Sequence, residues 1–193
     1  MEVLFMLEVE LKAVLTPEQA AGLPDRLAAL GYAPGALLRE TDVYWNGDSR
    51  DFRKTDEALR LRTAEDLKTH TAETLLTYKG PKRDGRSNTR TEYETAVGSM
   101  AAARGLLRAL GFRDLFTVDK TRREFSRGKV TVCLDSVAGL GEYLELEILL
   151  EDAERREAAV DTLLALLDTL GVRREALRRE SYLELLLRGS AME

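Results

Sequence analysis

Apolar and charged side chains alternate strictly from residue 7 to residue 12, in the order Leu-Glu-Val-Glu-Leu-Lys. Successive side chains of a β-strand point to opposite faces, so this segment predicts a strand with Glu8, Glu10 and Lys12 on one face. Similar alternation returns later in the chain. It predicts eight strands in all, over about residues 7–12, 37–45, 58–62, 74–79, 90–94, 115–125, 129–135 and 143–148.

Helix signals separate some of these strands. Thr16 is a good N-cap, Pro17 suits the first helical position, and Gly31 suits a helix end, so a helix is predicted up to about Leu30. Ser99 and Gly111 frame a second helix in the same way. Two more helices are predicted near the C-terminus, over about residues 152–170 and 173–187.

The chain contains an internal repeat in its order of strands and helices. The motif LAALGY at 27–32 closes the first helix and LRALGF at 107–112 closes the second. Each helix follows a strand with a Glu-x-Glu pair and precedes three strands. We therefore predict an α+β fold: an eight-stranded antiparallel barrel built from two strand-helix-three-strand halves, because closure removes exposed strand edges. A single domain would span 1–193, with the barrel at about 7–150 and C-terminal helices at about 152–188.

Charged side chains stand two residues apart in most of these strands. Carboxylates pair at Glu8/Glu10, Glu92/Glu94 and Glu145/Glu147, and bases pair at Arg60/Arg62 and Lys120/Arg122, with single additions at Lys12, Lys79, Arg90 and Arg123. These rows could face water, as on an ordinary antiparallel sheet. They could instead line a tunnel while the apolar rows pack beneath helices. Buried charges need partners or a ligand, and a polyphosphate with metal ions would complete their balance. The pattern alone leaves both arrangements open.

The bulk composition limits the function classes. Lys plus Arg is 29 and Asp plus Glu is 34, so the net charge of -5 disfavours a nucleic-acid partner. One cysteine excludes an intrachain disulfide framework, and one histidine excludes a multi-histidine zinc site. No stretch approaches the roughly 20 apolar residues of a membrane span, and no targeting segment is evident, so we expect no membrane partner and a cytoplasmic location. The polar segment 82–89 is expected to be a solvated loop, with a lid over the tunnel mouth as the alternative.

An ordered set of motifs runs through the strands. It comprises Glu8-Val9-Glu10-Leu11-Lys12, Thr41-Asp42-Val43-Tyr44, Ala58-Leu59-Arg60-Leu61-Arg62, Thr77-Tyr78-Lys79-Gly80-Pro81, Arg90 with Glu92 and Glu94, Lys120 with Arg122, Asp135, and Gly141-Glu142-Tyr143-Leu144-Glu145-Leu146-Glu147. This set resembles the CYTH superfamily of triphosphate tunnel metalloenzymes, whose N-terminal signature is ExExK. The resemblance covers residues 7 to about 150, and Ser181-Tyr182 resembles the ending of class IV adenylyl cyclases.

The resemblance implies a tunnel that binds a small-molecule triphosphate, ATP or tripolyphosphate, lengthwise. The implied ligands of Mg²⁺ or Mn²⁺ are Glu8, Glu10, Glu145 and Glu147. The implied phosphate-binding residues are Lys12, Arg60, Arg62, Lys79, Arg90, Lys120 and Arg122. The residues implied in catalysis are Glu8, Glu10, Lys12 and Asp135.

Within this superfamily the chain looks most like the class IV adenylyl cyclases, because of Lys79-Gly80-Pro81, the turn at 139–141 and the Ser181-Tyr182 ending. The alternative is a triphosphatase that hydrolyses tripolyphosphate, thiamine triphosphate or a nucleoside triphosphate. A non-catalytic polyphosphate or nucleotide binder is disfavoured, since binding alone would need only the bases. A homodimer would be plausible if the C-terminal helices exposed an apolar face.

Overall fold

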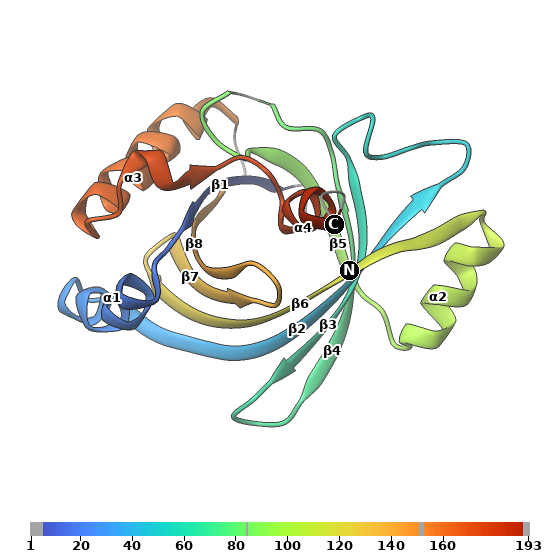
Figure 1. Ribbon diagram of the computed structural model, residues 1–193, viewed down its shortest axis with the longest axis horizontal. Helices are drawn as coiled ribbons and strands as arrows, with labels where there is room; N and C mark the ends of the chain where they lie inside the picture. Colours follow the sequence, from blue (N-terminus) through green and yellow to red (C-terminus); the bar gives the residue numbers. More distant parts are fainter. Residues whose placement is uncertain (1–5, 84, 151–152, 191–193) are drawn as a thin grey trace.

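The computed structural model describes residues 6–83, 85–150 and 153–190. Its strands form one antiparallel sheet in the order β5-β4-β3-β2-β6-β7-β8-β1-β9, and the pairing of β5 with β1 closes the first eight into a barrel (Figure 1). The strand bounds are β1 Met6–Val14, β2 Ala33–Gly47, β3 Ala58–Asp66, β4 Ala72–Lys79, β5 Arg90–Ala96, β6 Phe112–Arg127, β7 Val130–Val137, β8 Gly141–Leu150 and β9 Leu177–Arg178.

Two similar halves build the barrel, as the repeat predicted. In the first, β1 leads to helix α1 (Pro17–Ala29) and then to β2, β3 and β4. In the second, β5 leads to α2 (Met100–Ala109) and then to β6, β7 and β8. Helices α3 (Arg156–Thr169) and α4 (Tyr182–Ser190) follow the barrel. The predicted fold class is therefore confirmed, with β9 as one additional short strand. No helix among the described residues is long and apolar enough to cross a membrane.

Local sequence signals account for the helix ends. Thr16 accepts a hydrogen bond from the Gln19 backbone N–H at 3.3 Å, and the Gln19 side chain accepts one from the Thr16 N–H at 2.9 Å. This reciprocal capping box satisfies two amides that the first turn would leave unpaired. At the other end Gly31 has φ +79°, a conformation that glycine adopts without steric cost.

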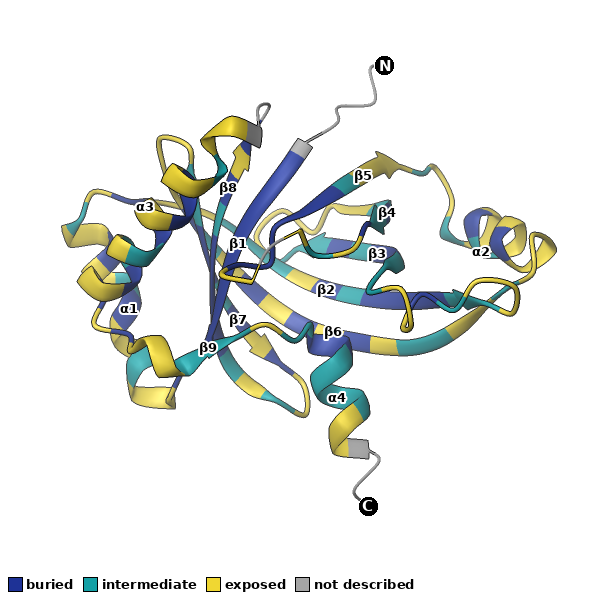
Figure 2. Cartoon of the chain, turned by 90° about the horizontal axis from the view of Figure 1, so that it is seen from above, coloured by how far each residue is buried: buried dark blue, intermediate teal, exposed yellow. Residues whose placement is uncertain are grey.

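The orientation of β1 decides between the two arrangements that the alternation allowed. Leu7, Val9 and Leu11 point outward and are at most 3% exposed, because α1 and α3 cover them (Figures 1 and 2). The acidic and basic row of β1 therefore points into the barrel, where Glu8 and Lys12 are buried as well. The largest hydrophobic cluster lies outside the barrel wall, and the charged rows lie inside it.

The other two helices pack against different parts of the barrel. Helix α2 packs its Leu107 against Val43, Trp45 and Leu61 of β2 and β3. Helix α4 lies in a separate apolar cluster, in which Leu183 joins aromatic and aliphatic residues of the strands, namely Tyr44, Val118, Val137 and Tyr143. Helix α4 thus brings residues from the far end of the chain to the barrel interior.

The C-terminal segment differs from the helix predicted over 173–187. A short 3₁₀ turn at Arg174–Ala176 leads into β9, and α4 begins only at Tyr182. The physical reason is an open edge on β1: Leu177 pairs with Ala13, and Arg178 pairs with Lys12. The preceding helix agrees with its prediction from residue 156, whereas Asp152 lies outside the described residues.

The expectation of a solvated loop is wrong for the end of the segment 82–89. Ser87, Asn88 and Thr89 are 2%, 6% and 0% exposed. The backbone N–H of Asn88 donates to the carbonyl oxygen of Glu10 at 3.0 Å, so these residues continue the wall where β5 leaves β1. Asp84, in the same segment, lies outside the described residues.

Candidate active site

The charged rows meet in a cavity of about 500 Å³ inside the barrel. Nearly every residue that the sequence suggested for binding or catalysis lines it: Glu8, Glu10, Lys12, Arg60, Arg62, Lys79, Arg90, Lys120, Arg122, Glu145 and Glu147. Asp135 is the exception, because it is fully buried behind two of the bases. The structure therefore brings eleven of the twelve suggested side chains to one surface and places the last directly behind it.

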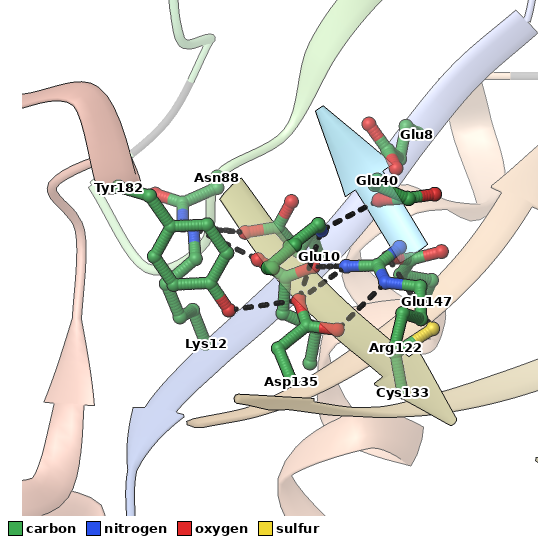
Figure 3. A network of polar contacts seen from close by, with 12 residues as sticks. Glu8, Glu10, Lys12, Glu40, Asn88, Arg122, Cys133, Asp135, Glu147 and Tyr182 are labelled. Atoms are coloured by element: carbon green, nitrogen blue, oxygen red, sulfur yellow. Dashed lines mark hydrogen bonds and ion pairs between the residues drawn. The ribbon is translucent and has the colours of Figure 1, made fainter. Parts of the chain in front are cut away.

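Asp135 orients the bases around it (Figure 3). Its carboxylate accepts hydrogen bonds from Lys120 at 3.0 Å and from Arg122 at 2.6 and 2.8 Å, and the Tyr182 hydroxyl of α4 donates to it at 3.0 Å. Burial would raise the pKa of Asp135, but the charges of Arg122 and Lys120 outweigh this effect and lower it. Asp135 is thus an anion that fixes basic side chains, with no surface of its own in the cavity.

Two acids that the sequence analysis did not assign to the site perform the same task on β2. Asp42 binds Arg62 in a bidentate pair at 2.6 and 2.8 Å, and Glu40 lies 2.9 Å from Arg62 and 3.1 Å from Lys120. Both acids are 2% exposed. The available signal was their spacing, since Glu40 and Asp42 also stand two residues apart on a predicted strand.

The register of β1 and β8 divides the four suggested metal ligands. Glu10 lies opposite Glu147, so like charges face each other, and Lys12 lies opposite Glu145, so opposite charges face each other. Glu8, Glu10 and Glu147 each place one carboxylate oxygen within 4.8 Å of the others. Glu145 instead pairs with Lys12 at 3.2 Å and with Arg122. Three carboxylates are therefore gathered as a group of hard oxygen donors, the type that Mg²⁺ and Mn²⁺ prefer.

The surroundings of these carboxylates raise the pKa of Glu147 and lower the pKa of Glu8. Burial raises the pKa of Glu147 to about 8, since the attraction of Arg122 is opposed by the negative charges of Glu8 and its neighbours. Burial also acts on Glu8, but Lys79, whose ammonium lies 3.0 Å from it, lowers the pKa of Glu8 to about 2. Without a cation, the group therefore holds a proton on Glu147 at neutral pH.

Charge inside the barrel is nearly balanced. Six acids are buried among the described residues, namely Glu8, Glu10, Glu40, Asp42, Asp135 and Glu145. Six bases are buried with them, namely Lys12, Arg60, Arg62, Arg90, Lys120 and Arg122. Because this interior carries little net positive charge, a strongly anionic ligand should bind more tightly when cations accompany it than when it binds to the bases alone.

A comparison with protein families agrees with this geometry. The CYTH domain model matches residues 6–182. The chain belongs to the CYTH domain family. A relative from Methanocaldococcus jannaschii, described as a "putative adenylate cyclase", is 33% identical over 180 residues, which are 93% of this chain and 98% of the relative.

Solved structures resemble this CYTH chain over nearly its whole length. The PH1819 protein of Pyrococcus horikoshii has a TM-score of 0.85 and 36% identity, with 94% of this chain and 99% of that chain covered. A protein of Hippeastrum, described as an adenylyl cyclase candidate with a dominant triphosphatase activity, has a TM-score of 0.68 and 16% identity, with 95% and 96% covered. At that identity the second likeness shows the fold alone.

The pKa of Glu147 predicts that cation binding depends on pH. A cation that binds all three of these carboxylates must displace the proton from Glu147. Affinity for Mn²⁺ should therefore rise about tenfold per pH unit from pH 6 to pH 8 and flatten above about pH 8, where Glu147 is already ionised. Titration calorimetry in two buffers of different ionisation enthalpy would measure the released proton. A pH-independent affinity would contradict the assignment of Glu147.

The buried pairing on β2 predicts a stability effect. Asp42→Asn leaves Arg62 buried without its bidentate partner, so the free energy of unfolding should fall by about 3–5 kcal/mol. Tripolyphosphate should restore part of this loss, because its oxygens can replace the missing carboxylate. The matched control is Asp119→Asn on the outer face of β6, which should change stability by less than about 0.5 kcal/mol. Equal denaturant midpoints for Asp42→Asn and the wild type would refute this account.

Proposed function

We propose that this CYTH protein is a metal-dependent enzyme that converts ATP to cyclic AMP and pyrophosphate. The observation that carries the proposal is the juxtaposition, in one cavity, of a three-carboxylate group with a wall of buried bases. A divalent cation and a chain of phosphates are the ligands whose charges suit these two surfaces.

The bases supply a track for phosphate oxygens. Arg62, Lys120 and Arg122 are held by acids behind them, so their orientation is set before a ligand arrives. Arg60 carries a buried Nε with no hydrogen-bond partner among the described residues. A phosphate oxygen would accept a hydrogen bond from this Nε. A planar guanidinium group can also donate two hydrogen bonds to one phosphate group.

The carboxylates fit a hard divalent cation. Glu8, Glu10 and Glu147 would hold Mg²⁺ or Mn²⁺, and Glu145 would join them only if it exchanged its pairing with Lys12. When bound, such a cation neutralises phosphate charge and lowers the pKa of a hydroxyl group bound to it. Lys12, 2.9 Å from Glu10 and 3.2 Å from Glu145, lies between the carboxylates and the bases, where it can bind an oxygen of the reacting phosphate.

The cavity extends beyond the charged rows, which favours a nucleotide over an inorganic polyphosphate. Phe52 of the β2–β3 connection and Leu183 and Leu187 of α4 also line it. Lys82 links these two walls through Asp56 at 2.9 Å and Glu184 at 3.6 Å. Apolar surface beside charged groups is what a base and ribose require.

In this assignment the ribose 3′-hydroxyl loses its proton to solvent and its oxygen attacks the α-phosphorus in line. The bond from that phosphorus to the bridging oxygen breaks, and pyrophosphate leaves along the bases. The attacking oxygen must lie about 3–3.5 Å from phosphorus, so the ribose has to fold back toward the triphosphate. The likeness to the Methanocaldococcus jannaschii relative, described as an adenylate cyclase candidate, supports this chemistry over others on the same fold.

A second candidate is hydrolysis of a terminal phosphate by water. Its support is that the carboxylates and bases of the cavity suit a cation and a chain of phosphates without any contact to an adenine base. The two chemistries share the phosphate track and differ in which phosphorus meets the nucleophile.

Products distinguish the two reactions. Incubation with ATP and Mg²⁺ or Mn²⁺ should yield cyclic AMP and pyrophosphate in equal amounts, measured by ion-exchange chromatography. A parallel incubation with tripolyphosphate should yield little orthophosphate. Orthophosphate from tripolyphosphate with no cyclic AMP from ATP would refute the cyclase and support the second candidate.

Two matched variants test whether formation of either product requires the three-carboxylate group. Glu10→Gln removes one charge from the cavity and should weaken Mn²⁺ binding more than tenfold and abolish turnover. Glu73→Gln removes one charge from the exposed part of β4 and should leave both unchanged. Wild-type turnover by Glu10→Gln would show that the group does not hold the required cation.

A further inference from the structure

One edge of β1 changes partners at the candidate metal site. Its pairing with β5 ends at Glu8 and Arg90, and its pairing with β9 begins at Lys12 and Arg178. Asn88 fills the interval, since its backbone N–H donates to the carbonyl oxygen of Glu10 at 3.0 Å. Asn88 therefore lies where the barrel closes, beside one of the three gathered carboxylates.

The side chain of Asn88 reaches the same residue. Its Nδ2 donates to Glu10 Oε1 at 3.0 Å and also lies 3.5 Å from the carbonyl oxygen of Arg178 (Figure 3). Lys12 Nζ donates to the same Glu10 oxygen at 2.9 Å. Within the described residues, the hydrogen bonds to the Glu10 carboxylate thus converge on Oε1, and Oε2 remains available for a cation.

The fold alone does not account for an amide at this position. Asn88 Oδ1 is buried without a hydrogen-bond partner among the described residues. A buried acceptor that lacks a donor reduces stability, whereas an apolar side chain of similar size would avoid that cost. The backbone N–H that closes the strand edge is available from any residue except proline.

We propose that Asn88 is a positioning residue that fixes the Glu10 carboxylate for divalent-cation binding. The inference rests on the proposed cation site and adds to it a residue that acts through Glu10. Asn88 contacts Glu10 twice: its backbone N–H binds the Glu10 carbonyl oxygen, and its side-chain amide binds the Glu10 carboxylate. Loss of the amide would let the carboxylate rotate toward Lys12 and away from Glu8 and Glu147.

The test measures Mn²⁺ affinity by electron paramagnetic resonance in Asn88→Leu, which keeps the number and branching of the side-chain heavy atoms, and in Asn88→Ala. Loss of a group that orients a metal ligand typically weakens binding 10–100-fold, so the dissociation constant should rise at least tenfold. The matched control is Asn46→Ala: Asn46 also donates to a carboxylate, Asp51 at 2.8 Å, but does not line the cavity. It should keep wild-type affinity.

A second measurement separates positioning from general damage. Tripolyphosphate affinity in the presence of EDTA depends on the bases, so Asn88→Leu should retain it within about twofold. Weakened binding of both ligands, or an unchanged Mn²⁺ affinity in a folded Asn88 variant, would overturn the inference. Absence of Mn²⁺ binding by the wild type would instead refute the proposed function.

Discussion

Buried charge is the constraint on which this structure depends. Six acids and six bases are buried in the barrel among the described residues, and an isolated charge in such a place would cost several kcal/mol. The pairing of Arg62 with Asp42, and of Lys120 and Arg122 with Asp135, offsets that cost. The same pairs hold the basic side chains in fixed orientations. The ion-pair network that offsets the cost of buried charge therefore also orients the bases of the candidate site.

A charged interior forces the apolar core to the outside of the barrel wall. The outward rows of β1 and β8 form one layer with α1 and α3, and a smaller layer forms beneath α2. Helix α4 is different, because its Tyr182 reaches Asp135 and lies beneath the ammonium groups of Lys12 and Lys120, at 4.8 and 5.3 Å from the ring centre. The end of the chain thus takes part in the same network as its first strand.

Much of this arrangement could be predicted from sequence. Strict alternation predicts strands, capping residues predict helix starts, and the repeated helix endings predict two halves. The side of the wall on which the charges lie could not be predicted from period-two alternation, because a strand has the same pattern in either orientation. Only the resemblance to the CYTH superfamily indicated the inward arrangement.

Features that depend on contacts between strands were harder to predict from the sequence. The register of β1 against β8 separates Glu145 from the other carboxylates, and no local pattern encodes that register. Pairing of β9 with β1 replaces part of a segment with helical propensity, since an open strand edge outweighs intrinsic preference. Asn88 looked like part of a polar loop, and its burial follows from where β5 leaves β1.

Crystals grown with Mn²⁺ and an ATP analogue that has a methylene group in place of the α–β bridging oxygen, so that pyrophosphate cannot leave, would test the central claim most directly. Anomalous diffraction at the manganese edge identifies the cation by its own scattering and so distinguishes it from water. The account predicts a peak bounded by Glu8, Glu10 and Glu147, with the triphosphate along Arg60, Arg62 and Arg122 inside the barrel. Manganese or triphosphate bound only to the outer surface would contradict it.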